Sequence, residues 1–152
     1  MTQLIIEKDI VIKRIEGVEA ELVELHKLAS LSKVEFSSGY GFKLAHYHLH
    51  RALEGVFNIG SHILSRLPGG QATQYKEIAL KLGELNLVPK EFATTKLVEM
   101  AKYRNRLVHF YAQITPEELY KILQTDLLDF ETFLSAVKNI LSHPEKYQLQ
   151  VE

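Results

Sequence analysis

The sequence predicts an all-α protein, an up-and-down bundle of about five helices. Apolar residues recur every three or four positions along almost the whole chain, which is the period of an amphipathic helix. No segment alternates convincingly between apolar and polar residues, as a half-buried strand does. The breaks between apolar stripes are short, which favours antiparallel neighbours. Because 46% of the 152 residues are hydrophobic, we expect one core and a single domain over 1–152.

The first two expected helices are long. One covers about residues 8–31 despite Gly17, and its stripe steps by four and three residues. That stripe comprises Val11, Ile15, Val18, Leu22, Leu25 and Ala29. The letters SSGYG interrupt the pattern, and a second stripe then continues to LPGGQ, where proline and paired glycine favour a turn. That second stripe comprises Phe42, Ala45, Leu49, Ala52, Val56, Ile59, Ile63 and Leu67.

Two further helices are expected in the middle of the chain. A short helix over about 73–84 shows helical spacing of apolar residues before the letters GELNLVPKE turn the chain. The next helix covers about 89–109, and Pro89 is predicted at its first position, where the missing N–H has no cost.

The last expected helix has the clearest start in the sequence. In the letters TPEE, Thr115 can cap the helix, Pro116 occupies its first position and Glu118 completes a capping box. Its apolar stripe continues without a break to SHPEK, where Pro144 is expected to end it.

The composition argues against several functional classes. A net charge of −1 gives no global attraction to nucleic acid or membrane, so any such contact needs a local patch. The absence of cysteine excludes disulfides, thiol nucleophiles and thiolate zinc sites. No signal-peptide layout, membrane-length apolar run, P-loop or nucleophile elbow is present. We therefore expect a soluble cytoplasmic protein.

One arginine breaks the apolar stripe of the helix over 89–109. The positions on that face are Ala93, Leu97, Met100, Arg104, Leu107 and Tyr111. Arg106, by contrast, lies on the opposite, solvated face. Because a guanidinium keeps its charge, Arg104 must meet a carboxylate, a set of carbonyls, or an anion in a cleft or interface. Periodicity alone leaves a structural ion pair and a functional site equally open.

His109 lies just beyond that arginine. On a straight helix it points roughly 140° away from Arg104, and it is the direct neighbour of Asn105 four residues earlier. The cap at Thr115 requires the helix to end before it, so His109 and Tyr111 lie at or near a helix C-terminus, which favours protonated histidine. A histidine beside an arginine suits phosphodiester cleavage. Simple C-terminal capping remains the plainer alternative.

Local charge supports contact with nucleic acid. Over 90–109 five cations outnumber two carboxylates, whereas over 115–131 five carboxylates outnumber one lysine. This polarity is compatible with a basic cleft on a neutral protein, although solvated charge is the commoner explanation. Lys102 and Arg106 are the candidate RNA contacts beside Arg104.

The letters YRNRLVHFY resemble the R-x4-H-x-Y motif of HEPN domains, specifically of HepT-type toxins. Arg104 is the motif arginine, Asn105 the polar residue that commonly follows it, His109 the histidine and Tyr111 the tyrosine. The resemblance extends over most of the chain, including RALEGVFNIGSHILSR, a proline–glycine turn and YKEIALKLGELNLVPKEF. In one departure, many relatives carry an acidic residue where we place Asn58.

The resemblance implies a metal-independent endoribonuclease toxin that needs no cofactor and works as a homodimer with both motifs lining one cleft. Arg104 would bind the phosphate, His109 would be the general acid–base, and Asn105 would orient them. The implied partner is a minimal nucleotidyltransferase antitoxin that transfers AMP to Tyr111. The alternatives are a non-catalytic HEPN-type module that binds a nucleotide or nucleotidyltransferase, and a bundle in which Arg104 is purely structural.

The letters AHYHLHR form a second group of titratable residues. His46 and His50 are four residues apart and share a helix face, but we see no carboxylate at matching spacing nearby and predict no metal site. The roles of His46, His48 and His50 stay open, with contact to RNA or partner preferred. His62 is interpreted as a satisfied, half-buried histidine.

Overall fold

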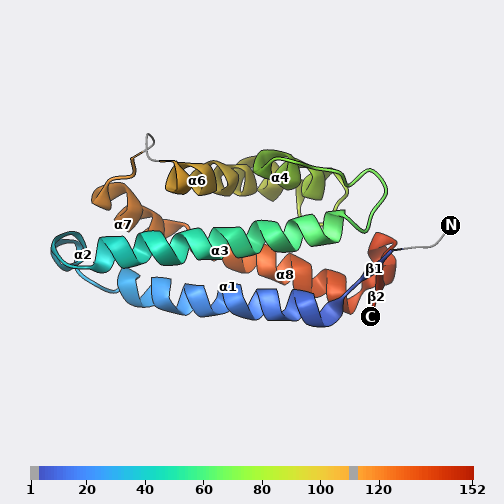
Figure 1. Cartoon of the computed structure of the whole chain (residues 1–152), viewed down its shortest axis with the longest axis horizontal. Helices are drawn as coiled ribbons and strands as arrows, with labels where there is room; N and C mark the ends of the chain where they lie inside the picture. Colours follow the sequence, from blue (N-terminus) through green and yellow to red (C-terminus); the bar gives the residue numbers. More distant parts are fainter. Residues whose placement is uncertain (1–3, 110–112) are drawn as a thin grey trace.

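A computed structural model describes residues 4–109 and 113–152. Within these ranges the chain forms seven helices and a pair of two-residue strands (Figure 1). The first four helices are α1 (Lys8–Ala29), α2 (Lys33–Ser38), α3 (Gly41–Leu64) and α4 (Tyr75–Glu84). The fifth is one uninterrupted helix made of α5 (Lys90–Phe92), a π-helical turn (Ala93–Leu97) and α6 (Val98–Val108). The last two are α7 (Pro116–Thr125) and α8 (Leu128–Ser142). A 3-10 turn (Pro144–Tyr147) follows, and β1 (Ile5–Ile6) pairs in parallel with β2 (Gln150–Val151).

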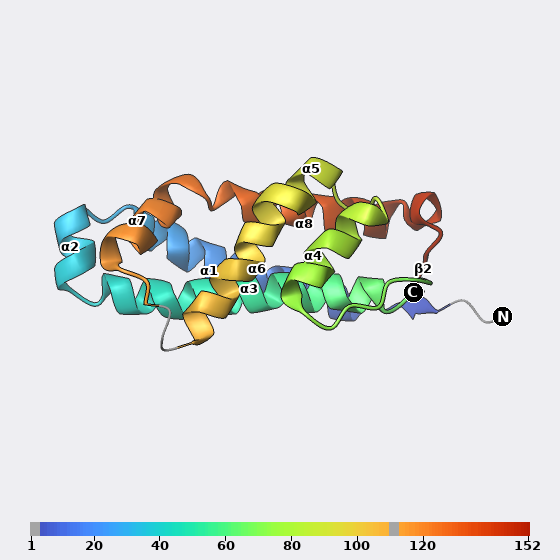
Figure 2. The ribbon, with the colours of Figure 1, turned by 90° about the horizontal axis from the view of Figure 1, so that it is seen from above.

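The central element of the fold is α3. It lies antiparallel to α1 along the long axis of the molecule, and α8 packs beside this pair (Figure 1). On the other side of α3 lie α4 and α6, which contact each other and cross α3 obliquely in the view from above (Figure 2). The prediction of a helical bundle is therefore confirmed, but two of its helices cross the long axis instead of following it.

A single apolar core explains this arrangement. Buried residues of α3 face both α1 and the layer of α4 and α6, and the largest fully buried side chains are Phe36, Phe57 and Phe133. Among the described residues no charged or polar side chain is fully buried. None of the described helices is both long and apolar enough to cross a bilayer.

The predicted count of about five helices is wrong at two places. The short helix α2 was missed, although the letters SKVE contain the pattern of a capping box. In the structure Ser32 Oγ accepts from the N–H of Glu35, and the Glu35 carboxylate accepts from the N–H of Ser32. The last helix is divided at Asp126, whose N–H closes α7 on Ile122 and whose carboxylate accepts from the hydroxyl of Thr125. The expected end before Pro144 is confirmed.

The strands are a second correction. We expected no strand, yet β1 and β2 join the two ends of the described chain. The N–H of Lys8 donates to the Glu152 carbonyl at 2.8 Å, and the N–H of Glu152 donates to the Ile6 carbonyl at 3.0 Å. Runs of two residues are too short to show the alternation by which a strand is identified in sequence.

Two helical glycines are expected to respond in opposite ways to replacement by alanine. A Cβ at Gly55 would lie 2.5 Å from Val18 Cγ2, because α1 and α3 approach closely there, whereas a Cβ at Gly17 would meet nothing within 4 Å. Gly17→Ala should raise the free energy of unfolding by about 1 kcal/mol through helix propensity. Gly55→Ala should lower it, because overpacking costs about 1–3 kcal/mol. Urea denaturation measures both, and equal shifts of the same sign would contradict this packing.

Candidate functional site

The motif residues lie at the end of α6. Arg104 and Asn105 belong to its last turns, and His109 is the first residue after it, with extended backbone angles (φ −98°, ψ 126°). The N–H of His109 still donates to the Asn105 carbonyl at 3.2 Å. The prediction that this helix ends near residue 109, before the cap at Thr115, is therefore confirmed. Tyr111 lies outside the described residues.

Arg104 occupies the predicted break in the apolar face. Its stripe neighbours Leu97, Met100 and Leu107 are buried, while its own side chain is 20% exposed. Its Nε donates to Oε1 of Glu54 in an ion pair, and its Nη1 donates to Asn105 Oδ1 at 3.3 Å. Arg104 was expected to meet a carboxylate, a set of carbonyls or an anion, and the structure shows a carboxylate, that of Glu54 on α3.

Glu54 connects three helices at this site. Besides Arg104 of α6, it receives a hydrogen bond at Oε2 from the hydroxyl of Tyr75, at the start of α4, at 3.3 Å. The Arg104 guanidinium carbon lies 4.1 Å from the centroid of the Tyr75 ring, a cation–π contact. Burial and the nearby Glu54 carboxylate raise the pKa of Tyr75 above its usual range.

Sequence reasoning missed Glu54, although its spacing was visible. It follows His50 by four residues on α3, and His50 Nε2 lies 3.5 Å from Glu54 Oε1. The statement that no carboxylate stands at matching spacing near these histidines is therefore wrong. The neighbouring Asn58, one turn later, uses its main-chain carbonyl to accept from Arg14 at 3.4 Å.

The three histidines of the AHYHLHR segment of α3 have different surroundings. His48 Nδ1 bonds Oε2 of Glu21 on α1 at 2.6 Å, and the other oxygen of Glu21 accepts from Arg51 at 2.7 Å. Burial acts to raise the pKa of Glu21, but the hydrogen bonds from Arg51 and His48 outweigh it and lower the pKa. Burial, followed by the charge of His50, lowers the pKa of His46. No group of metal-ligating side chains suited to an ion occurs among the residues that the structure covers.

Glu54 also borders a surface groove between α1 and α3, with a volume of about 480 Å³. Arg14, Tyr47, His50 and Arg51 line it, together with Glu21 and Asn58. The ion pair of Glu54 and Arg104 is therefore reached from solvent beside a groove that offers cationic and aromatic side chains.

The two candidate RNA contacts differ in their surroundings. Lys102 is exposed and pairs with Glu99 one turn earlier at 3.3 Å. Arg106 is only 36% exposed and makes two hydrogen bonds to the Glu118 carboxylate on α7. Thr115 caps α7 and Pro116 opens it as predicted, but the expected capping box is incomplete, because Glu118 directs its carboxylate to Arg106.

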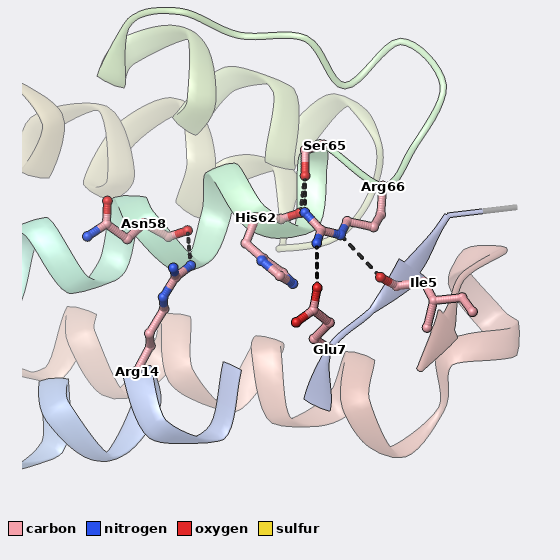
Figure 3. Close-up of polar contacts among 7 residues, drawn as sticks. All are labelled: Ile5, Glu7, Arg14, Asn58, His62, Ser65 and Arg66. Atoms are coloured by element: carbon pink, nitrogen blue, oxygen red, sulfur yellow. Dashed lines mark hydrogen bonds and ion pairs between the residues drawn. The ribbon is translucent and has the colours of Figure 1, made fainter. Parts of the chain in front are cut away.

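His62, at the end of α3, was predicted to be half-buried and hydrogen-bonded, and only the first of these predictions is confirmed. Figure 3 shows its imidazole between Arg14 on one side and the pair of Glu7 and Arg66 on the other, which lie 3.4 Å apart. The side chain is half-buried, but its buried Nε2 makes no hydrogen bond to the described residues. Burial, with Arg66 and Arg14 adding to it, lowers the pKa of His62 below its ordinary 6.5.

This shift predicts a dependence of stability on pH. Between the lowered folded pKa of His62 and its ordinary value, the unfolded chain binds the proton more readily. The free energy of unfolding should therefore fall as the pH drops below about 6.5. His62→Gln should show a smaller drop in Tm between about pH 8 and about pH 5.5 than the unchanged protein. An identical drop in both proteins would contradict the assignment.

Comparisons with a family model, a curated relative and solved structures all match this chain to proteins of one helical fold. Residues 18–137 match the family model described as "Ribonuclease HepT-like". The tRNA nuclease HepT of Aphanizomenon flos-aquae (strain 2012/KM1/D3) is 26% identical over 137 residues, covering 90% of this chain and 92% of that protein.

Two solved structures share the arrangement of helices. One is a tri-AMPylated Shewanella oneidensis HEPN toxin in complex with MNT antitoxin, with a TM-score of 0.78 at 22% identity. The other is a toxin–antitoxin with AMP-PNP, with a TM-score of 0.77 at 21% identity. In each case 86% of this chain and 98% of the other chain are covered.

Proposed function

The chain belongs to the HepT-like ribonuclease family, and from that premise we propose that it is an endoribonuclease toxin that cleaves RNA without a metal ion. The observation that carries the proposal is the position of Arg104 and the set of hydrogen bonds that its guanidinium makes. It is the cation that interrupts the apolar face of α6, and Glu54 holds it through Nε. Its Nη2 makes no hydrogen bond to the residues that the structure describes, so that edge of the guanidinium can bind a phosphate.

In the proposed reaction His109 takes the proton of a ribose 2′-hydroxyl. The 2′-oxygen attacks the adjacent phosphorus, the bond from phosphorus to the 5′-oxygen breaks, and that oxygen leaves with a proton from an acid. The products are a 2′,3′-cyclic phosphate and a 5′-hydroxyl. Arg104 stabilises the charge that grows on the non-bridging oxygens, and Asn105 Oδ1 orients the guanidinium through Nη1.

A homodimer with one shared cleft suits this chemistry. The reaction needs a base for the 2′-hydroxyl and an acid for the leaving oxygen, and each chain carries one His109 in its motif. Two chains would supply both groups at once, whereas a single chain would use His109 for both steps in turn. We propose that all 152 residues form one domain in this assembly, with Lys102 as an RNA contact at the rim.

The proposed partner is a minimal nucleotidyltransferase antitoxin that transfers AMP to Tyr111. Two features support it: a structural neighbour is an AMPylated toxin bound to MNT antitoxin, and Tyr111 follows His109 by two residues. A phosphate on Tyr111 would bring an anion beside Arg104 and would occupy the place of the RNA phosphate.

Modification should therefore silence the enzyme. Incubation with the antitoxin and ATP is expected to lower the rate of RNA cleavage by roughly 100-fold or more, because the phosphate-binding group is then paired. Tyr111→Phe should cleave RNA but resist silencing. Mass spectrometry of the chain and a cleavage assay give both results, and an AMPylated protein with full nuclease activity would contradict this regulation.

A second candidate function is a non-catalytic module that binds a nucleotide or the nucleotidyltransferase. The ion pair with Glu54 favours it, because a guanidinium already neutralised by a carboxylate attracts phosphate less strongly. Cleavage of RNA by the purified protein in EDTA selects the enzyme, and binding of the antitoxin without cleavage selects the module.

A further inference from the structure

Arg106 makes a set of contacts that a solvated RNA-binding arginine does not need. Its Nη1 lies 2.6 Å from Glu118 Oε1 and its Nη2 lies 3.0 Å from Glu118 Oε2, so the guanidinium fork is paired with both carboxylate oxygens. The same Nη2 also donates to the Gln113 carbonyl at 3.4 Å. Its guanidinium carbon lies 5.0 Å from the centre of the Tyr103 ring.

Glu118 is held from several directions as well. The hydroxyl of Tyr103 donates to Oε1 at 2.5 Å, and the main-chain N–H of Glu118 donates to Thr115 Oγ1 at 3.1 Å. The hydrogen bonds from Arg106, more than any other cause, lower the pKa of Glu118. Burial and the bond to Glu118 raise the pKa of Tyr103 well above its usual range. We call Tyr103, Arg106, Gln113 and Glu118 the α6–α7 clamp.

The α6–α7 clamp joins the two sides of one short segment. Residues 109–115 connect the end of α6 to the cap of α7, and they carry His109 and Tyr111. Arg106 lies three residues before His109, and Gln113 lies two residues after Tyr111. The contacts of Arg106 therefore hold Gln113 and the first turn of α7 against the last turn of α6, which His109 directly follows.

We propose that Arg106 is a positioning residue, which holds Gln113 and Glu118 against the end of α6 so that His109 meets the scissile phosphate bound by Arg104. This inference rests on the proposed nuclease function and reassigns Arg106, expected from sequence as an RNA contact. An RNA phosphate at Arg106 would have to displace a carboxylate that already matches the fork.

Two substitutions separate the positioning role from RNA contact. Arg106→Lys keeps the charge but loses the fork, and Glu118→Gln keeps the shape but removes the charge of the partner. If Arg106 positions the segment, both should lower kcat by roughly 10- to 100-fold, with KM changed by less than about 2-fold, because small displacements of a catalytic group are costly. If Arg106 contacts RNA, Glu118→Gln should release it and lower KM, and kcat should stay.

The charge-exchanged double variant Arg106→Glu/Glu118→Arg offers a rescue. It should recover part of the kcat lost in Arg106→Glu alone, since the pair is rebuilt with its sign reversed. Glu19→Gln is the matched control, because it breaks a 3.1 Å ion pair between α1 and α8 away from the motif, and its kcat should stay unchanged.

Hydrogen exchange tests the inference independently of nuclease activity. In Arg106→Lys and Glu118→Gln the amides of His109 and Gln113 should exchange at least about tenfold faster, while amides of α1 keep their rates. Faster exchange throughout the chain would make Arg106 a general stabilising residue and overturn the inference. So would unchanged exchange at His109 and Gln113, or a kcat that survives both substitutions. Should the unchanged protein cleave no RNA, the nuclease proposal fails, and exchange alone still decides whether the α6–α7 clamp holds His109 and Gln113 in place.

Discussion

His109→Ala is expected to slow RNA cleavage by roughly 10²- to 10⁴-fold, the usual contribution of a general acid–base. His109 directly follows the last turn of α6, and its side chain is exposed there. Because truncation of an exposed side chain costs little stability, the Tm should change little. The loss should appear in kcat, because the imidazole acts on protons that move only in the transition state.

A control is available on the same chain. His143 follows the last turn of α8 just as His109 follows that of α6, and it is exposed as well. His143→Ala should cleave RNA at the rate of the unchanged protein. A cleavage rate of His109→Ala within about threefold of the unchanged protein would remove His109 from the mechanism, since general acid–base catalysis contributes far more.

Arg104→Ala is expected to lower kcat/KM for RNA by roughly 10²- to 10³-fold or more, the usual cost of losing a group that stabilises the transition-state charge. It should also lower the free energy of unfolding by about 1–2 kcal/mol, because the Glu54 carboxylate, 27% exposed, loses its partner. Circular dichroism and urea denaturation measure the second effect separately from the first.

A double variant separates the structural role of Arg104 from the catalytic one. Arg104→Met/Glu54→Gln removes both charges and keeps side chains of similar length, so the stability should return close to that of the unchanged protein. Its nuclease activity should stay absent. Activity that returned together with stability would mean that Arg104 only holds the fold, the purely structural reading.

The sequence predicted the position of Arg104 but not its partner. Helical spacing placed it on an apolar face, and the cost of burying a guanidinium required a carboxylate, a set of carbonyls or an anion nearby. Glu54 lies 50 residues earlier in the chain, on α3, and only the crossing of α6 over α3 brings the two together. Such a contact depends on tertiary packing, which periodicity along one helix does not contain.

Some helix boundaries could be predicted from the sequence and others could not. The end of α6 near residue 109 was expected from the cap at Thr115. The start of α2 could have been predicted from the letters SKVE, although it was missed. The break at Asp126 was not readable from the apolar stripe, because apolar residues keep helical spacing on both sides of it. Capping residues in the sequence therefore predict where helices begin and end. The break between α7 and α8, by contrast, coincides with hydrogen bonds of Asp126 that the apolar pattern does not contain.

The role expected for Arg106 shows a further limit. Its place on the polar face of α6 was correct, but its pairing with Glu118 depends on where α7 begins relative to α6. The sequence pattern of a charged residue on a polar helix face is the same whether that residue contacts solvent, RNA or a carboxylate. The distances to Glu118 are what favour the last of these.

Cleavage of RNA by the purified protein in EDTA tests the central claim most directly. Transfer RNA is the first substrate to use, because a relative is named as a tRNA nuclease. We expect cleavage that persists in EDTA, yields a 2′,3′-cyclic phosphate, stops when the attacking 2′-hydroxyl is replaced by hydrogen, and is lost in Arg104→Ala and His109→Ala. Cleavage that requires a metal ion, that cuts DNA equally well, or that survives both substitutions would contradict the account.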